Sequence, residues 1–246
     1  MIYPDLKGKT VFVIGANGGI GFALVEELVQ HECNVIALVR DSANNFRFSD
    51  LASIEVLNYN LSQREEIKQW LEDFENKGNK VDVLVNNAGV YEVQSLIDAT
   101  EEDWDYYFDV NLRSAFFVAQ LFTRHMKSNG GGTIINAASF AAKMASENMG
   151  LYATSKAALV SLTKSMAAEW AKYDIRVNCY SPGVIETQMT APVIAKNKDA
   201  MLSKIAMKRF GDASEGVAGI LFLMSNQSSY ITGINLEIDG GKYLVQ

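Results

Sequence analysis

Histidine, cysteine and proline are scarce in this chain of 246 residues, and each scarcity argues against a class of site. The two histidines, His31 and His125, argue against a multi-histidine metal site and against a histidine-based catalytic triad. The two cysteines, Cys33 and Cys179, lie far apart among apolar residues, so we expect buried thiols and neither a metal site nor a disulfide framework. Any proton transfer must therefore use other side chains.

Long apolar runs and an excess of basic residues are also missing. No stretch of about 18 uninterrupted apolar residues occurs, and the N-terminus MIYPDLKGKT lacks the basic-then-apolar order of a secretory signal. We therefore expect a soluble, cytoplasmic protein without a membrane partner. The formal net charge of −7 argues against nucleic acid as the main partner, although a small local basic site is compatible with it.

Only three prolines occur, and neither a low-complexity tract nor an internal repeat marks a linker, so we expect one domain over residues 1–246. Short Val/Ile-rich runs alternate with longer helical patterns. The expected strands are 10–15, 34–39, 54–59, 81–87, 132–139, 175–182 and 234–241, and the expected helices are 22–30, 64–76, 103–126, 152–173 and 214–225. Because most of these strands are apolar almost throughout, the sequence predicts an α/β fold: a Rossmann-type, doubly wound parallel sheet with helices on both faces.

The least regular segment, residues 186–209, is long for a connection between a strand and a helix, and such connections are often functional lids. Its large apolar side chains would either accept an apolar substrate of varied shape or pack the lid onto the sheet: Met189, Val193, Ile194, Met201, Leu202, Ile205 and Met207. The loop 141–150 would supply the other wall of the substrate site, with Lys143, Asn148 and Met149 as candidate contacts.

A glycine cluster in VIGANGGIG, with Gly15, Gly19 and Gly21, follows an expected strand and opens an expected helix. Glycine lets the main chain reverse and approach a pyrophosphate without a Cβ in the way, while the amides of a helix N-terminus face the negative charge. The spacing G-x-x-x-G-x-G differs from the common G-x-G-x-x-G but suits the same task. Phe22 stands where a nucleotide-triphosphate loop has lysine, so a dinucleotide is the better ligand.

The end of the second expected strand should select between the nicotinamide cofactors. An acidic side chain there hydrogen-bonds the adenosine ribose, whereas a cation pairs with the extra phosphate of NADP. Counting from the last glycine would allow Asp41 to be the acid, but a strand that ends at Val39 makes Arg40 the first loop residue. We therefore favour NADP(H), with NAD(H) as the alternative in which Arg40 is only a solvated loop charge.

Tyr152 and Lys156 are four residues apart on an expected helix, which puts the phenol and the ammonium on one face. A nearby cation favours phenolate, so we expect Lys156 to lower the pKa of Tyr152 and make it a general acid or base. Taken alone, such a pair is more often surface packing. Ser139, at the carboxyl end of an expected strand, and Asn111, a polar residue among apolar neighbours, favour catalysis.

Together these motifs resemble the classical short-chain dehydrogenase/reductase family. The resemblance spans the chain from IGANGGIG through VNNAG, Asn111, Ser139, Tyr152-x-x-x-Lys156 and SPGVIET to YITGINLEIDGG. It implies an oxidoreductase in which Tyr152 exchanges a proton with the substrate oxygen and Ser139 holds that oxygen. It also implies that Lys156 lowers the tyrosine pKa and binds the nicotinamide ribose, while Asn111 anchors a water that passes protons towards Lys156.

The same resemblance implies further cofactor contacts. Residues 87–89 would pass beside the adenosine ribose, residues 60–61 would meet the adenine, and residues 182–187 would line the nicotinamide, with the Ile185 backbone at its carboxamide and Thr187 near the pyrophosphate. The residues expected to bind cofactor are Gly15, Asn17, Gly18, Gly19, Ile20, Gly21, Arg40, Asn60, Leu61, Asn87, Ala88, Gly89, Tyr152, Lys156, Pro182, Gly183, Ile185 and Thr187.

Two letters of the glycine motif depart from the family pattern. Ile14 stands where the family usually has threonine, and Gly18 stands where NADP-preferring members often carry a basic residue, which weakens the case for NADP(H). The C-terminal stretch is similar to 3-oxoacyl-[acyl-carrier-protein] reductases and to reductases of sugars, steroids, polyols and small ketones. An acidic carrier would need cations at the mouth of the site. The chain offers Arg124, Lys127 and Lys172 there, but has Gly130 and Tyr173 where those reductases often have arginine.

A competing function of another class is a dinucleotide-binding regulator without turnover, against which the presence of both Tyr152 and Lys156 argues. A nucleotide-sugar epimerase or dehydratase would usually need a longer C-terminal region. The resemblance also implies a homotetramer, built from the long helices around Asn111 and Tyr152 and from the C-terminal strand. Burial of those apolar faces inside one subunit would give the same pattern.

Overall fold

The computed structural model describes residues 2–40, 47–51, 53–61, 63–145, 147–242 and 244. Seven strands within them form one sheet in the order β3-β2-β1-β4-β5-β6-β7, and all neighbouring strands are parallel. The order changes direction between β1 and β4, which confirms the predicted doubly wound sheet. The strands are β1 (Thr10–Ile14), β2 (Asn34–Val39), β3 (Ile54–Asn58), β4 (Val83–Asn86), β5 (Gly132–Ala137), β6 (Ile175–Pro182) and β7 (Asn235–Ile238).

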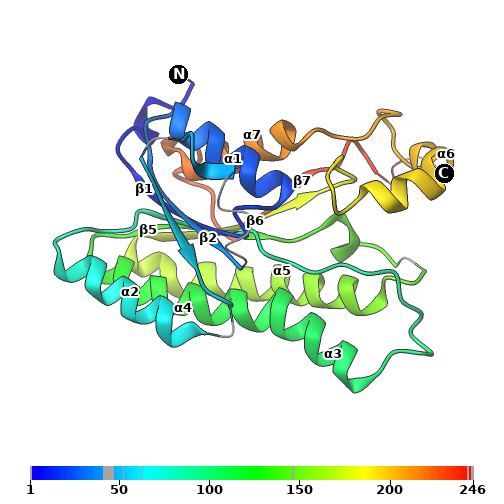
Figure 1. The fold of residues 1–246 in the computed structure, drawn as a ribbon, viewed down its shortest axis with the longest axis horizontal. Coiled ribbons are helices and arrows are strands. Elements are labelled where there is room, and N and C mark those ends of the chain that lie inside the picture. Colours follow the sequence, from blue (N-terminus) through cyan, green and yellow to red (C-terminus); the bar gives the residue numbers. More distant parts are fainter. Residues whose placement is uncertain are drawn as a thin grey trace.

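Helices cover both faces of the sheet (Figure 1). On one face lie α1 (Gly19–Gln30) and α7 (Ala213–Met224), and on the other lie α2 (Arg64–Asn76), α4 (Ser114–Ser128) and α5 (Gly150–Trp170). The shorter α3 (Glu101–Phe108) lies on the α5 side, and α6 (Ala191–Ser203) lies at one end of the molecule. Single 3₁₀ turns occur at Pro4–Leu6, Phe140–Ala142, Ala171–Tyr173 and Asn226–Ser228.

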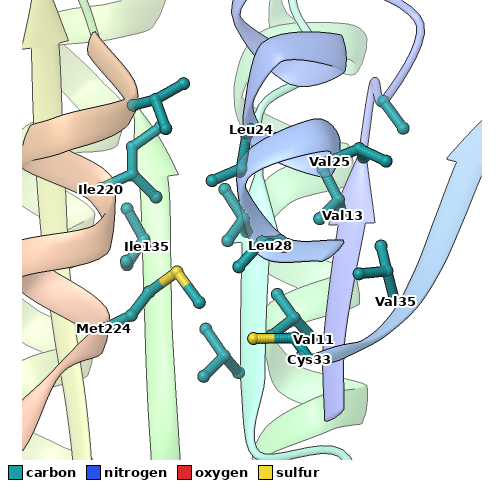
Figure 2. Close-up of a cluster of buried hydrophobic side chains, with 14 of the residues drawn as sticks. Val11, Val13, Leu24, Val25, Leu28, Cys33, Val35, Ile135, Ile220 and Met224 are labelled. Carbon is teal, nitrogen blue, oxygen red and sulfur yellow. The ribbon is translucent and has the colours of Figure 1, made fainter. Parts of the chain in front are cut away.

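The side chains of β1 explain why its sequence is apolar throughout. Val11 and Val13 pack under side chains of α1 and α7 in one core cluster (Figure 2). Phe12 and Ile14 point to the opposite face and join a second cluster with residues of α2, α4 and α5. A strand covered on both faces has no solvent-facing side, so period-two alternation of polar residues is absent.

The two cysteines are buried free thiols, as expected from the sequence. Burial raises the pKa of Cys33 and of Cys179 to about 11, so both remain protonated near neutral pH. Among the described residues, the structure has no helix whose length and apolar character would let it cross a membrane.

The helix predicted over residues 103–126 contains a wider turn in the structure. A π-helical turn over Asp109–Arg113 separates α3 from α4, and it carries Asn111. Such turns contain one extra residue and are frequent at functional sites. The prediction of a long helix is therefore confirmed, but the wider turn within it was not predicted, because the apolar periodicity of the flanking turns hardly changes when a single turn widens.

The segment 186–209 contains α6, which has a kink at Asn197. Its apolar side chains divide between the two expected roles. Ile205 is fully buried, and Ile194, Met201 and Leu202 pack against its cluster, whereas Met189 and Met207 are 57% and 58% exposed. Packing of the segment onto its own small core thus accounts for the first group, and only the second group remains at the surface.

Candidate active site

The predicted site residues gather at the carboxyl edge of the sheet, where all parallel strands end. Gly15 follows β1, Arg40 follows β2, Asn87 follows β4 and Ser139 lies two residues beyond β5. In the sheet order, β2 and β3 lie on one side of β1, and β4 and β5 lie on the other. An elongated ligand can therefore run along this edge from the end of β3, across β1, to the end of β5.

Gly15 makes the turn that leaves β1. Its φ is +72°, and a Cβ at this position would lie 2.9 Å from both the N and the Cα of Ala88. The side-chain amide of Asn87 donates to the Gly15 carbonyl at 3.2 Å, and Asn87 itself accepts from the buried hydroxyl of Tyr180. The loop after β4 therefore fixes the shape of the glycine turn.

The first turn of α1 is open to solvent. Gly18 is the N-cap residue, no described side chain caps the helix, and both Gly18 and Gly19 are exposed. Gly21 lies inside the turn, where a Cβ would lie 2.2 Å from the Gly15 carbonyl oxygen. Ile20 directs its side chain towards Gly216 of α7 and so leaves only its backbone at the turn. Helix amides without a side-chain cap and an approach free of Cβ atoms fit the pyrophosphate of a dinucleotide.

Arg40 is exposed at the first position after β2, as expected, while Asp41, the alternative acidic residue, lies outside the described residues. A second cation, Arg47, was not predicted. Its Nη1 donates to the carbonyl of Asn17 at 2.8 Å, and its guanidinium carbon lies 3.9 Å from the centroid of the Phe22 ring. The sequence shows Arg47 only as a second arginine in the connection between β2 and β3, and nothing around it indicates a contact with the glycine turn.

The predicted adenine contacts follow β3. Asn60 is exposed, and its backbone amide donates to the side-chain oxygen of Gln63 at 2.8 Å. Leu61 packs, partly buried, against the core cluster beneath α2. Both residues thus stand at the same edge as Arg40, one strand further from β1.

Ser139 and Tyr152 are brought together as predicted. Ser139 is buried at the start of a 3₁₀ turn, where its Oγ accepts from the amide of Ala141 at 3.2 Å. Tyr152 lies in the first turn of α5, and its phenol is hydrogen-bonded to the side chain of Ser139. The ring of Tyr91 packs edge-on against Tyr152, with the centroids 5.2 Å apart.

Lys156 lies one turn further along α5 and is buried. Its Nζ donates to the carbonyl of Ala137 at 2.7 Å and lies 6.0 Å from the centroid of the Tyr152 ring. Burial lowers the pKa of Lys156 to about 8 and raises the pKa of Tyr152 to about 12. Loss of hydration dominates at both groups and the ammonium contacts a carbonyl instead of the phenol, so the lowering of the tyrosine pKa by Lys156 stays a prediction.

Asn111 is buried, as its apolar neighbours suggested. Its Oδ1 accepts from the amide of Val90 at 2.9 Å, and its Nδ2 donates to the Val90 carbonyl at 3.2 Å and to Ser155 Oγ at 3.0 Å. Asn111 thus joins the loop after β4 to α5. A Cβ on Gly89 would lie 3.0 Å from Lys156 Nζ and 3.2 Å from Asn111 Oδ1, so both polar groups converge on Gly89.

The segment after β6 begins with tight packing against β7. Pro182 is the last residue of β6, and a Cβ on Gly183 would lie 2.6 Å from the Cα of Asp239. Ile185 then forms an isolated parallel bridge with Gly211. That bridge uses the amide of the following residue and the carbonyl of the preceding one, so the amide of Ile185 points away from it.

At Thr187 the segment after β6 comes into contact with the glycine turn. A Cβ on Gly19 would lie 2.4 Å from Thr187 Cγ2, so the threonine side chain rests directly on the start of α1. Its amide donates to Thr190 Oγ1 at 3.0 Å, which orients the turn that precedes α6. The structure thus brings Thr187 to the glycines, as expected for a residue near the pyrophosphate.

Three residues beside Tyr152 escaped prediction: Tyr91, Glu92 and Tyr107. Tyr107 is buried in α3, and its hydroxyl accepts from the amide of Glu92 and donates to the carbonyl of Glu92, each at 3.0 Å. These two hydrogen bonds fix the loop after β4 at the point where the ring of Tyr91 packs on Tyr152. A small pocket here also includes Asn148 and Met149 of the predicted wall. The loop has no periodic pattern, so the sequence carried no signal for it.

A separate cavity of about 420 Å³ lies behind the segment after β6 and is lined by Val184, Ile185, Arg209 and Glu215 among others. None of the four predicted catalytic residues is among the described residues that line it. Lys143, a predicted substrate contact, forms an ion pair with Glu237 on its wall. The predicted catalytic residues therefore gather beside Tyr152 and not in this cavity.

The cations expected at the mouth of the site lie elsewhere in the chain. Arg124 and Lys127 are near the end of α4, just before β5 begins, and Lys172 precedes β6. Residues that precede parallel strands lie at the amino edge of the sheet, opposite Ser139. Lys127 and Lys172 both stand over the ring of Tyr173, at 4.4 Å and 5.2 Å from its centroid. The expectation that these three cations lie at the mouth of the site is therefore wrong within one subunit.

Comparisons with known proteins agree with this geometry. The family model described as "Enoyl-(Acyl carrier protein) reductase" matches residues 15–242. A 3-oxoacyl-[acyl-carrier-protein] reductase of Thermotoga maritima is 37% identical over 241 residues, which cover 96% of this chain and 98% of the relative. An NAD-dependent glycerol dehydrogenase of Listeria innocua is 37% identical over 243 residues, which cover 96% of this chain and 94% of the relative.

Among solved structures, 7α-hydroxysteroid dehydrogenase complexed with NADH and 7-oxo glycochenodeoxycholic acid matches with a TM-score of 0.91 and 29% identity, over 96% of this chain and 95% of the other. The match of the family model extends from the glycine turn to the residues after β7. From the fold, the site and these relatives, the chain belongs to the short-chain dehydrogenase/reductase family of nicotinamide-dinucleotide-dependent oxidoreductases.

Proposed function

We propose that this protein is an NAD(P)H-dependent oxidoreductase that reduces the carbonyl group of a small molecule to a secondary alcohol, or catalyses the reverse. The observation that carries the proposal is the hydrogen-bonded pair of Ser139 and Tyr152, with buried Lys156 one turn away. The pair lies at the same sheet edge as the glycine turn. A regulator without turnover would have no use for a proton donor at this position.

The bound nicotinamide dinucleotide would supply or accept the hydride. Tyr152 would donate its phenolic proton to the carbonyl oxygen, and a pKa of about 12 keeps that proton in place at neutral pH. Ser139 would hold the same oxygen by a hydrogen bond. Lys156, with a pKa of about 8, carries its charge near neutral pH and would bind the nicotinamide ribose. Asn111, which converges with Lys156 on Gly89, would hold a water on the route of the proton.

The remaining cofactor contacts follow the order of the strands. Gly15, Gly18–Gly21 and Thr187 would surround the pyrophosphate, because the open start of α1 and the threonine meet there. The loop after β4 would pass beside the adenosine ribose, and Asn60 and Leu61 would reach the adenine. Pro182 and Gly183 would line the nicotinamide, and the amide of Ile185, which points away from its bridge to Gly211, would meet the carboxamide.

The cofactor preference that we propose is NADP(H). Exposed Arg40 at the end of β2 supports it, since a cation there suits the extra phosphate. The names of the relatives support the alternative, because one is NAD-dependent and another was solved with NADH. Michaelis constants for NADPH and NADH test the preference, and a clear preference for NADH would overturn it.

A narrower candidate substrate is a 3-oxoacyl group on an acyl-carrier protein, which the Thermotoga maritima relative favours. The position of Arg124, Lys127 and Lys172 at the amino edge argues against an acidic carrier at this mouth. A panel of sugars, polyols, steroids and small ketones, together with an acetoacetyl thioester, should therefore be tested by NADPH absorbance. Oxidation of NADPH by none of these compounds, despite tight cofactor binding, would favour the regulator.

We also propose that the chain acts as one domain with residues 186–209 as a lid, and that it assembles as a homotetramer. Exposed aromatic rings on α3 and α4 support assembly, since Trp104 and Phe117 are 49% and 38% exposed and Trp104 stacks on Phe108 at 4.2 Å. Light scattering distinguishes the tetramer from smaller species. A cytoplasmic location stays a prediction, for which cell fractionation is the test.

A further inference from the structure

Two contacts hold Arg47 against the glycine turn. One is to Asn17, which precedes Gly18 in the sequence, and the other is to Phe22, which follows Gly21. Its Nη1 donates to the carbonyl of Asn17 at 2.8 Å, and its guanidinium carbon stands 3.9 Å from the centroid of the Phe22 ring. The Phe22 ring packs in turn against that of Phe48, which is buried, at 5.5 Å. The arginine therefore arrives from the β2–β3 connection but is fixed on the first turn of α1.

The sheet order tells which end of a dinucleotide lies near Arg47. Ser139 and Tyr152 mark the reactive end beyond β5, and the glycine turn after β1 marks the pyrophosphate. A dinucleotide that spans these two points must continue towards the ends of β2 and β3, where its adenosine half lies. Arg47 belongs to the connection between these two strands, so its charge stands between the pyrophosphate position and the adenosine position.

We propose that Arg47 binds the phosphate ester on the adenosine ribose of NADP(H), and so supplies the positive charge that the glycine turn lacks because residue 18 is glycine. The proposal rests on the proposed function and deepens it, since it names the residue that sets cofactor preference. Gly18 has no side chain that could separate Arg47 from a phosphate at the open start of α1. Arg40, exposed at the end of β2, adds a second cation on the same side.

The way in which Arg47 is anchored suits this task. The guanidinium carbon of Arg47 lies over the Phe22 ring, and a guanidinium in such a contact still has N–H donors that can bind phosphate oxygens. The hydrogen bond to Asn17 takes a single N–H of the several that the group carries. Because Phe22 already restricts the side chain, less conformational freedom is lost when the phosphate binds.

The test measures binding without turnover, by titration calorimetry with adenosine 2′,5′-bisphosphate and with adenosine 5′-monophosphate. Arg47→Gln should weaken the bisphosphate at least about tenfold and the monophosphate less than about twofold, because a charge-assisted hydrogen bond to the extra phosphate is lost. Phe22→Leu keeps the charge but removes the ring, and should give a smaller loss in the same direction. Thermal melting of each variant verifies the fold.

Arg64→Gln is the matched control, because Arg64 also stands over an aromatic ring, that of Phe117 at 5.0 Å, but on the opposite helical layer. It should leave both affinities unchanged. An equal loss of both nucleotides in Arg47→Gln, or no loss of either, would overturn the inference while the dinucleotide site stands. Failure of the wild-type protein to bind either nucleotide would overturn the proposed function itself, together with the inference.

Discussion

The reactive end of the site and its adenosine end are held by different kinds of contact. At the reactive end, a buried chain of hydrogen bonds runs from Asn86 of β4 to Asn136 of β5 and on to Thr163 of α5, at 2.8 Å and 2.9 Å. Lys156 adds a further bond from α5 to β5. At the adenosine end, Arg40 and Asn60 are exposed, and Arg47 is attached from a connecting loop.

This difference teaches which properties of the enzyme can change independently. Buried, mutually bonded groups are costly to alter, because removal of one partner leaves another unsatisfied. The contacts at the adenosine end lie outside that buried chain of hydrogen bonds, so cofactor selectivity can shift while the position of the reacting groups stays fixed. The comparison predicts that substitutions at the reactive end affect turnover, and that those at the adenosine end affect affinity.

Of all the substitutions, that of Tyr152 should reduce turnover most. Tyr152→Phe keeps the ring that packs on Tyr91 but removes the proton donor, so kcat for carbonyl reduction should fall about 1,000-fold. Dinucleotide affinity should stay within about twofold, because the adenosine end is untouched. Steady-state kinetics and calorimetry measure the two effects.

The matched control for that substitution is Tyr173→Phe. Tyr173 lies just before β6, at the amino edge of the sheet, so loss of its hydroxyl should leave kcat unchanged. Turnover by Tyr152→Phe at the wild-type rate would remove the tyrosine from the mechanism.

Lys156→Met should lower kcat about 100-fold, because a charge close to the reacting groups is lost. The same variant tests the cost of burial. The unfolded lysine keeps its proton up to about pH 10.5 and the folded one only to about pH 8, so between these values Lys156 binds more protons in the unfolded chain and its own contribution to wild-type stability rises with pH. The methionine variant lacks this gain. Its stability relative to wild type should therefore be higher at about pH 7 than at about pH 10.5, by on the order of 3 kcal/mol.

Urea unfolding at the two pH values measures this difference. Lys164→Met is the control, since Lys164 is exposed two turns further along α5 and should show no pH-dependent difference from wild type. A pH-independent difference for Lys156→Met would mean that the buried ammonium keeps an ordinary pKa.

How far the sequence predicts such effects depends on the range of the contacts involved. Periodicity and strand composition identified the sheet and its carboxyl edge, because they report which faces are buried. The direction of the pKa shift of Tyr152 could not be predicted, since its burial depends on tertiary packing, which includes a contact with Tyr91 from a loop without a pattern. Arg47 was missed for the same reason: its contacts join a connecting loop to α1, and nothing in either local sequence marks them.

A smaller effect is expected where the two ends meet, at the glycine turn. Gly15 and Gly78 both have positive φ, +72° and +80°, but only at Gly15 would a Cβ meet backbone, at 2.9 Å from Ala88, while at Gly78 it would meet nothing within 4 Å. Gly15→Ala should therefore cost about 2 kcal/mol more than Gly78→Ala, because the loop after β4 must move. Only the Gly15 variant should also bind dinucleotide less tightly. Equal unfolding free energies for the two variants would show that the loop after β4 can move away from the added methyl group at little cost.

The smallest effect should come from the two hydrogen bonds by which Tyr107 fixes the loop after β4. Tyr107→Phe removes the hydroxyl that holds both the amide and the carbonyl of Glu92, so Tyr91 loses its fixed position over Tyr152. The expected result is a rise in the substrate KM of about threefold with kcat and dinucleotide affinity nearly unchanged, since the lost hydrogen bonds act on positioning and not on the reacting atoms. Tyr106→Phe, at the exposed neighbouring position, should change neither constant. A fall in kcat without a rise in KM would instead place Tyr107 among the groups that act in the transition state, and the reactive end would then extend into α3.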